Sequence, residues 1–275
     1  MGKQLLSIPS FTAGELSSRM EGRTDFQKYF SGCTVLENFV VLPHGPVTRR
    51  PGTYFVSEIK TSANNTRLIP FEFSTTQTYV LELGNNYIRF FKDDGQITSG
   101  GSAYEISTPY TTAQLFDLKF AQSADVMYIC HPEHEVSKLS RTGHTSWSLD
   151  EVDFGDNGPY MDANTTTTTL TPSNASTGSR NITASAITGI NGGVGWLATD
   201  VGRVISMNNG KATITARTSA TVAVATVTDA FDNTNAVTDW KLGSFSDTTG
   251  HPSCVSFFEQ RLVFASTTSQ PQTMF

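Results

Sequence analysis

The residues with the clearest potential for chemistry are two histidines and two carboxylic acids within five positions, in the sequence HPEHE at 131–135. Imidazole and carboxylate groups are common ligands of transition metals. Two ligands three positions apart, such as His131 and His134, need a helix to bring both rings to one ion, and Pro132 argues against a helix here. The sequence has no HExxH motif and no obvious third ligand. The pattern favours a solvated turn, and we expect neither a metal nor another cofactor.

A second acidic stretch, DEVDFGDNG at 150–158, invites comparison with calcium-binding loops. With Asp153 as the first ligand, the third position of that template falls on Gly155 and the twelfth on Asn164. Neither residue suits its position, because the template requires an oxygen ligand at the third and a bidentate glutamate at the twelfth. We therefore interpret the stretch as a polar turn.

Patterns of nucleophilic and nucleotide-dependent enzymes are missing from the sequence. It has no GxSxG, Walker or dinucleotide-binding glycine motif, and the glycines of 192–195 lack a strand-to-helix context. Two carboxylates for glycoside hydrolysis can be nominated in any chain of this size, and nothing here selects one pair. The sequence thus predicts a protein that is not an enzyme.

The composition favours a β-rich protein. Charged residues make up 16% of the 275 residues, below the roughly 25% of a typical globular chain, and neutral polar residues fill the difference. The formal net charge of −6 argues against a surface that grips nucleic acid or an anionic membrane. No apolar run approaches 18 residues, so we expect no membrane span. The three cysteines suggest reduced thiols rather than a disulfide framework.

The elements that would position any site change in type near residue 47. Before it, Thr24 or Asp25 could cap a short helix with Phe26, Tyr29 and Phe30 on one face. After it, hydrophobic residues alternate with period two from Tyr54 to Phe90, separated by polar turns. We expect a short N-terminal helical arm followed by β-sheets.

Three stretches of the chain repeat a strand–turn–strand–turn pattern: residues 71–91, 118–141 and 255–275. With Phe73, Phe120 and Phe258 as anchors, the repeats are 47 and then 138 residues apart. A propeller blade spans roughly 40–50 residues. The first spacing fits one blade, and the second predicts an insertion. HPEHE occupies the turn that corresponds to GNN at 84–86.

Residues 160–245 supply a suitable insertion. The segment contains four short runs rich in β-branched residues, and NNG at 208–210 is typical of a hairpin turn. Trp196, Phe231 and Trp240 could form its core, so we expect a small β-barrel or sandwich. The predicted plan is mainly β, with propeller-like or stacked sheet units, a helical arm and one inserted domain. Its segments are 1–46, 47–159, 160–245 and 246–275, the last an incomplete return to the blade-like domain.

Two adjacent arginines, Arg49 and Arg50, follow a turn in the sequence PHGPVTRRPGTYF at 43–55. Neighbouring strand residues face opposite ways, so at most one of them points to a given surface. Two interpretations remain open: solvated arginines at a sheet edge, or an arginine held by carboxylates of a neighbouring chain.

Three long motifs resemble one known family. They are FTAGELSSRMEGRTDFQKYFSGCTVLENFVVLPHGPVTRRPGTYFV (11–56), FAQSADVMYICHP…KLSRTGHTSWSL (120–149) and GHPSCVSFFEQRLVFASTTSQPQTMF (250–275). They are similar to the tail nozzle proteins, or tail tubular proteins B, of short-tailed bacteriophages and related prophages. The segment 160–245 resembles a small β-domain of some members, often named after a domain of the ubiquitin-activating enzyme. That name implies no ubiquitin chemistry.

The resemblance implies a structural protein of the virion tail, assembled in the bacterial cytoplasm. Its subunits would form a hexameric ring of β-rich, propeller-like parts below the portal and adaptor, beside other tail proteins. DNA would pass through the lumen without specific binding, which suits an acidic chain. Members usually continue beyond QPQTMF, so this sequence could be a fragment, a short gene product or a processed chain.

The family's opening motif matches positions here that we assign to contact with a neighbouring subunit or the adaptor. Together with the arginine pair, these are Glu15, Arg19, Arg23, Asp25, Tyr29, Arg49 and Arg50. The alternative function is a tail component that binds or cleaves host-surface glycans. It would require a groove lined by exposed Trp or Tyr with facing carboxylates.

Overall fold

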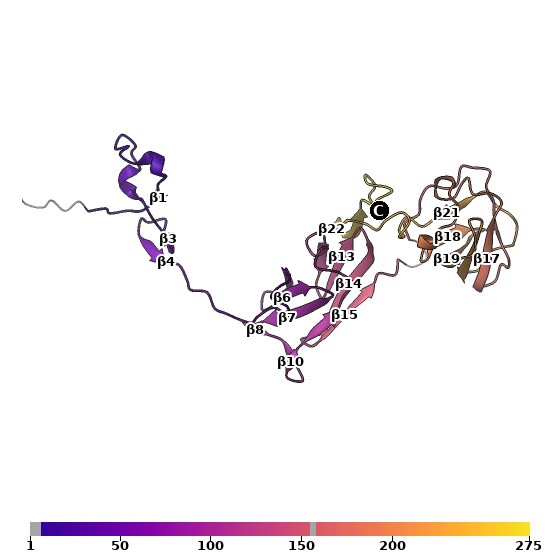
Figure 1. Cartoon of the computed structure of the whole chain (residues 1–275), viewed down its shortest axis with the longest axis horizontal. Helices are drawn as coiled ribbons and strands as arrows, with labels where there is room; N and C mark the ends of the chain where they lie inside the picture. Colours follow the sequence, from indigo (N-terminus) through magenta and orange to yellow (C-terminus); the bar gives the residue numbers. More distant parts are fainter. Residues whose placement is uncertain (1–6, 155–157) are drawn as a thin grey trace, which may run out of the picture. The chain divides into compact units, whose positions relative to one another are not determined.

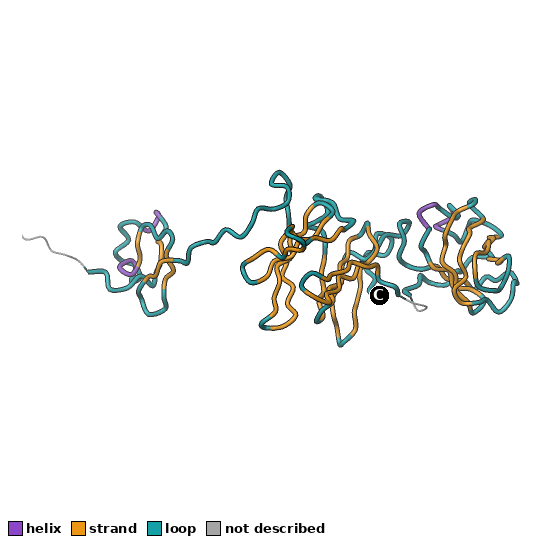
Figure 2. Tube along the Cα trace, turned by 90° about the horizontal axis from the view of Figure 1, so that it is seen from below, coloured by secondary structure: helices purple, strands orange, loops and turns teal. Residues whose placement is uncertain are grey.

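The computed structural model describes residues 7–154 and 158–275, and these residues are mainly β-structure. Figure 2 shows strands and loops throughout, with helix only as short turns. No α-helix occurs in the described ranges, in which helical structure is limited to short 3₁₀ turns. The chain divides into two compact units, the first ending at Phe55 and the second beginning at Val56. Each unit is described by itself.

The first unit consists of two minimal sheets and two 3₁₀ turns. Strand β1 (Gly14–Glu15) pairs in parallel with β2 (Gly32–Cys33), and β3 (Phe39–Val41) pairs antiparallel with β4 (Val47–Arg49). The turns η1 (Ser18–Met20) and η2 (Tyr29–Ser31) lie between β1 and β2.

The predicted amphipathic helix near Phe26–Phe30 is wrong, because only the single 3₁₀ turn η2 forms there. An isolated helix shorter than roughly 12 residues is marginal without a core to pack against. This unit offers no such core, since its fully buried residues are Gly32 and Gly45 alone among those described. Tyr54 and Val56, expected on a strand, lie in a stretch without regular structure.

The second unit begins with an antiparallel sheet in the order β11-β7-β6-β5, with β8 beside β7 (Figure 1). Its strands are β5 (Arg67–Ser74), β6 (Gln77–Gly84), β7 (Tyr87–Lys92), β8 (Gly95–Gln96) and β11 (Glu105–Ser107). A small separate hairpin joins β9 (Thr98–Ser99) to β10 (Ser102–Ala103). The expected polar turns separate these strands and lie at 74–77, 84–87 and 92–95.

A second antiparallel sheet follows in sequence order. It contains β12 (Lys119–Ser123), β13 (Val126–His131), β14 (His134–Gly143) and β15 (Ser146–Glu151). The two sheets share one hydrophobic core, to which each contributes alternate residues of its strands. Trp147 of the second sheet stacks its ring on Phe90 of the first, at 4.3 Å between centroids.

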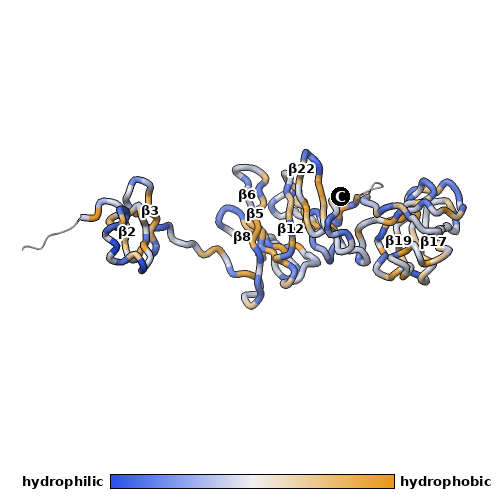
Figure 3. Tube along the Cα trace, turned by 90° about the horizontal axis from the view of Figure 1, so that it is seen from above, coloured by the Kyte–Doolittle hydropathy of each residue, from blue (hydrophilic) through white to orange (hydrophobic). Residues whose placement is uncertain are grey.

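The second sheet is covered on its other face as well. The hairpin of β22 (Cys254–Phe258) and β23 (Arg261–Ala265) packs there, in a cluster that includes Cys130, Val136 and Phe264. Residues of β13 therefore alternate between two cores, with Ile129 facing the first and Cys130 the second. In Figure 3, these strands carry many of the hydrophobic positions and several connecting turns are hydrophilic.

The three anchor phenylalanines are not equivalent in the structure, although the repeated strand pattern is present. The first strand of each stretch ends at a two-residue turn, closed by Ser74, Ser123 and Phe258. Counted from these turns, Phe120 corresponds to the buried Phe71 rather than to Phe73. A bulge between Glu72 and Ser74 shifts the register. The correct spacing, from Ser74 to Ser123, is 49 residues.

Strands between residues 170 and 242 form a separate six-stranded sheet in the order β16-β17-β20-β19-β18-β21. They are β16 (Leu170–Pro172), β17 (Gly178–Ala184), β18 (Val204–Met207), β19 (Gly210–Arg217), β20 (Val222–Asp229) and β21 (Trp240–Leu242). Two 3₁₀ turns, η4 (Asn191–Gly193) and η5 (Ala198–Asp200), precede β18. The predicted hairpin at 208–210 is confirmed, because Asn208 and Asn209 have the positive φ values that a type I′ turn requires.

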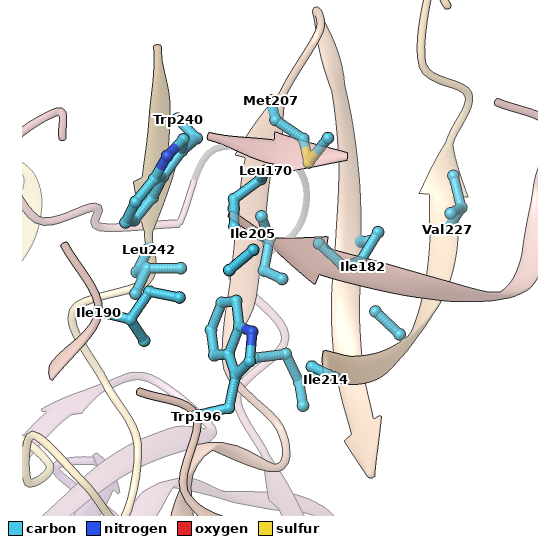
Figure 4. Packing of buried hydrophobic residues seen from close by; sticks show 14 of the residues in the cluster. Leu170, Ile182, Ile190, Trp196, Ile205, Met207, Ile214, Val227, Trp240 and Leu242 are labelled. Atoms are coloured by element: carbon cyan, nitrogen blue, oxygen red, sulfur yellow. The ribbon is translucent and has the colours of Figure 1, made fainter. Parts of the chain in front are cut away.

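This sheet has its own hydrophobic core. All buried members of the cluster lie between Leu170 and Leu242. Figure 4 shows the rings of Trp196 and Trp240 directed toward the group that contains Leu170, Ile205 and Leu242. The prediction that Trp196, Phe231 and Trp240 are buried is confirmed.

Candidate assembly surface

The seven residues assigned to contact a neighbouring chain all lie in the first compact unit. Six of them are exposed and Tyr29 is half-buried. Their side chains fall into three groups. Arg23, Asp25 and Tyr29 make hydrogen bonds within the loop 22–29, Glu15 and Arg50 make hydrogen bonds to residues distant in sequence, and Arg19 and Arg49 form the third group. Their contact with a partner stays a prediction.

The loop 22–29 contains one ion pair, between Arg23 and Asp25. Arg23 donates through Nε and Nη2 to both carboxylate oxygens of Asp25, at 2.8 and 2.7 Å, which holds the pKa of Asp25 below its usual value. The backbone N–H of Gly22 donates to the Tyr29 hydroxyl at 3.2 Å. Arg23, Asp25 and Tyr29 therefore shape one loop.

The hydrogen bonds of Glu15 and Arg50 connect segments that are distant in sequence. Leu36 donates its backbone N–H to Glu15 Oε2 at 2.9 Å, and Arg50 Nε donates to Asn38 Oδ1 at 2.7 Å. Arg49 lies opposite Phe39 in the β3–β4 register, so the two side chains share a face. Arg49 is thus the member of its pair that projects from the hairpin beside an apolar residue.

Apolar exposure is the dominant feature of this region. None of the described residues before Ile69 is a buried hydrophobic side chain. Ten large hydrophobic residues between 8 and 56 are exposed: Ile8, Phe26, Phe30, Val35, Phe39, Val40, Leu42, Tyr54, Phe55 and Val56. Tyr54 and Phe55 reach 79% and 77% exposure. Exposed apolar surface on this scale is typical of protein contact sites.

An apolar groove of about 340 Å³ lies within the same unit. Its wall includes Leu16, Met20 and Phe30. The sequence signal for this surface was available, since Phe26 and Phe30 were recognised as apolar and interpreted as a helix face. Local sequence does not show that, among the described residues of the unit, Phe26 and Phe30 remain exposed.

The HPEHE stretch forms the turn between β13 and β14, as predicted. His131 pairs with His134 across the two-residue turn of Pro132 and Glu133. The expectation of a solvated turn holds for Glu133, which is exposed, and is wrong for His131, which is only 3% exposed. Residues distant in sequence contact this turn: His251 donates its backbone N–H to Pro132 O at 3.0 Å, and Gln114 Oε1 lies 3.1 Å from His134 Nε2.

The two imidazole rings are 5.2 Å apart. Desolvation lowers the pKa of both His131 and His134, and the proximity of His131 lowers the pKa of His134 further. The Glu133 carboxylate raises both pKa values, but by less than desolvation lowers them. The folded state therefore favours two neutral rings near neutral pH.

Acidification is expected to destabilise the protein through this pair. A histidine whose pKa is depressed by folding stabilises the native state fully above its unfolded pKa of about 6.5, and this stability is lost as the pH falls below that value. Glu135 opposes the trend, because desolvation and Glu151 raise its pKa to about 7, so its protonation favours folding as the pH falls.

The free energy of unfolding by denaturant, measured between pH 7 and pH 5, separates the contribution of the histidines from that of Glu135. The wild type is expected to lose more stability than His131→Asn, which retains Glu135 but cannot take up the proton. His44→Asn, at an exposed position, serves as the control and should follow the wild type. If the free energy of unfolding changes equally with pH in all three proteins, His131 does not cause the loss of stability on acidification.

A buried ion pair near η5 escaped sequence analysis. Asp200 and Arg203 are 0% and 1% exposed, with Arg203 Nη1 3.1 Å from Asp200 Oδ1. Asp200 Oδ2 accepts from the backbone N–H of Leu197 at 2.8 Å and from Asn191 Nδ2 at 2.7 Å. Arg203 also donates to Gly243 O and Asn191 Oδ1, each at 2.8 Å. Arg203 lines a cavity of about 470 Å³, but the hydrogen bonds of the pair connect the surrounding loops.

The described residues show few other features suited to metal binding or nucleophilic catalysis. In residues 7–154 and 158–275, no group of three or more His, Cys, Asp or Glu side chains is arranged to hold a metal ion. Burial raises the pKa of the Cys130 thiol to about 12, which makes it a poor nucleophile at neutral pH. Part of the acidic stretch 150–158 lies outside the described residues.

No family model matches the chain, and no curated protein matches it. Within the described residues, no helix is long and apolar enough to cross a membrane.

Proposed function

We propose that this chain is a structural subunit of a bacteriophage tail, in a nozzle ring below the portal and adaptor, and that it works by assembly rather than catalysis. The observation that carries the proposal is the exposed apolar surface of residues 8–56. A unit of about 50 residues without a hydrophobic core has too little buried surface to be stable alone. Burial of this apolar surface against other chains supplies the missing stabilisation.

Stacked, blade-like sheets support the architectural part of the proposal. The β12–β15 sheet is packed on both faces, and the strand pattern of β5–β7 recurs in β12–β14 at a 49-residue spacing. A spacing of this size is that of a propeller blade. The arrangement suits the propeller-like units that the family resemblance implies.

Pairing between the ends of segment 160–245 supports the proposal that this segment is an inserted domain. Tyr160 forms a bridge with Gly243, and Met161 donates its backbone N–H to Leu242 O at 2.8 Å. The chain thus enters and leaves the segment at neighbouring points. A domain inserted into a loop requires this proximity, because the host sheets must continue on either side.

The charge of the chain supports the passage of DNA without retention. Residues 56–275 contain 13 Lys and Arg against 21 Asp and Glu, a net charge of −8. A surface of this sign repels a phosphate backbone. The glycan-directed alternative has less support, because Trp147, Trp196 and Trp240 are all buried, and the exposed Tyr54 lies in a stretch without regular structure rather than on a sheet.

The mass of the purified protein in solution tests the proposal. A ring of about six copies, or a defined oligomer that binds portal–adaptor particles, is the expected result. A protein that stays monomeric at high concentration, alone and with those particles, would rule out the structural role. Oligosaccharide binding by such a monomer would favour the alternative.

A further inference from the structure

The outer face of the β5–β6–β7 sheet is partly uncovered in the described structure. Glu82 and Tyr87 lie on this face but are buried and hydrogen-bonded to each other, whereas the part around Leu68 and Val80 is exposed. Strand alternation places Leu68, Pro70, Val80 and Phe91 on the face opposite the shared core, and Pro70–Val80 and Val80–Phe91 are direct cross-strand pairs. Leu68 is 63% and Val80 43% exposed. The neighbouring β12–β15 sheet, by contrast, has both faces packed.

The charges beside this apolar stripe are mainly negative. Glu72 lies on the same face next to Pro70, paired with Thr78. At the other end, Glu105 accepts from Lys60 and Arg89 at 2.5 and 3.0 Å, so both cations are already engaged. Glu72 is therefore the group on this face best placed for an incoming cation.

The first unit carries a surface of complementary character. Residues 1–55 contain six Lys and Arg against four Asp and Glu, a net charge of +2, while residues 56–275 carry −8. On the β3–β4 hairpin, the exposed Phe39 lies directly opposite the exposed Arg49, and Val41 opposite Val47. One face of the hairpin thus combines an apolar stripe with a cation.

We propose that the β3–β4 hairpin of one copy docks on the outer face of the β5–β6–β7 sheet of a neighbouring copy, with Phe39 against Leu68 and Val80 and Arg49 toward Glu72. The inference rests on the proposed assembly function and names its interface. Because the two surfaces differ, the contact is heterologous, and a heterologous contact that closes produces a ring.

A matched pair of valine substitutions tests the docking face. Val80→Asp places a charge in the stripe, and Val201→Asp places one at 46% exposure between residues 170 and 242. We expect Val80→Asp to weaken self-association at least tenfold in analytical ultracentrifugation, and Val201→Asp to change it less than twofold. Thermal unfolding of both variants checks that the fold is retained.

Charge reversal provides a second test that does not depend on the stripe. Arg49→Glu and Glu72→Arg should each weaken association several-fold, and the double variant should restore most of it. Wild-type assembly with no effect of Val80→Asp, or a double variant weaker than either single one, overturns this interface and leaves the structural role standing. A monomeric wild type removes the proposed function and the interface together.

A mixture of isotopically labelled and unlabelled copies, with a photo-crosslinker at position 68, distinguishes a neighbour's arm from the chain's own. Crosslinks to residues 34–50 that join the two labels support the proposal. Crosslinks within one label only would contradict it.

Discussion

Replacing Trp147 with alanine is expected to lower the free energy of unfolding of the two stacked sheets by about 3–5 kcal/mol, the usual range for a buried tryptophan. The side chain is 7% exposed, and its ring centroid lies 4.8 Å from that of Phe71 and 5.3 Å from that of Tyr79. Because Phe71 and Tyr79 belong to the first sheet and Trp147 to the second, the substitution opens a cavity between them.

Trp196→Ala is the matched comparison, since Trp196 is equally buried in the core formed by residues 170–242. Scanning calorimetry of both variants should show two transitions. Trp147→Ala is expected to shift the transition of the stacked sheets, and Trp196→Ala the other one. If each substitution shifts a single common transition, the two cores unfold together and the segment 160–245 is not an independent folding unit.

Local patterns predicted most of the β-structure, for reasons that lie in the backbone. Period-two alternation and polar turn residues constrain a strand within a few positions, and Asn208-Asn209 carries its own turn preference. The register of the repeat was less certain, because a single bulge at Glu72–Ser74 moves Phe73 out of the core. Sequence spacing alone does not reveal such an insertion.

The candidate site was harder to predict, since it depends on what lies next to each residue in space. His131 looked like a solvated turn residue because the segment that contacts its turn, around His251, is far away in sequence. The aromatic residues of the N-terminal arm looked like a helix face because Phe26, Tyr29 and Phe30 are spaced three and four positions apart. Exposure of an apolar residue is a property of the whole fold, and local composition does not contain it.

The pair Asp200 and Arg203 was missed for a related reason. Their spacing of three is unremarkable in a polar loop, and their burial follows from the packing of loops around Gly243 and Asn191. A sequence signal exists in hindsight: an acid and an arginine lie on either side of Val201-Gly202, just before the β18 strand. Such a signal is too common to select this pair from others.

Replacing Asp200 with alanine is expected to destabilise the 160–245 segment by about 3–5 kcal/mol, the range found when one partner of a buried ion pair is removed. The Arg203 guanidinium would remain buried without a counter-charge, and the Leu197 N–H would lose its acceptor. Chemical denaturation monitored by tryptophan fluorescence measures the loss. Asp25→Ala breaks an exposed Asp–Arg pair and should leave stability unchanged.

The double variant Asp200→Leu with Arg203→Met isolates the cause. Replacing both charges by apolar groups removes the unpaired cation, so stability should recover by at least half of the single-variant loss. If Asp200→Ala unfolds no more easily than Asp25→Ala, the pair does not brace these loops. If the double variant is less stable than Asp200→Ala, the hydrogen bonds of Arg203 to Gly243 and Asn191 stabilise the loops more than its unpaired charge would destabilise them.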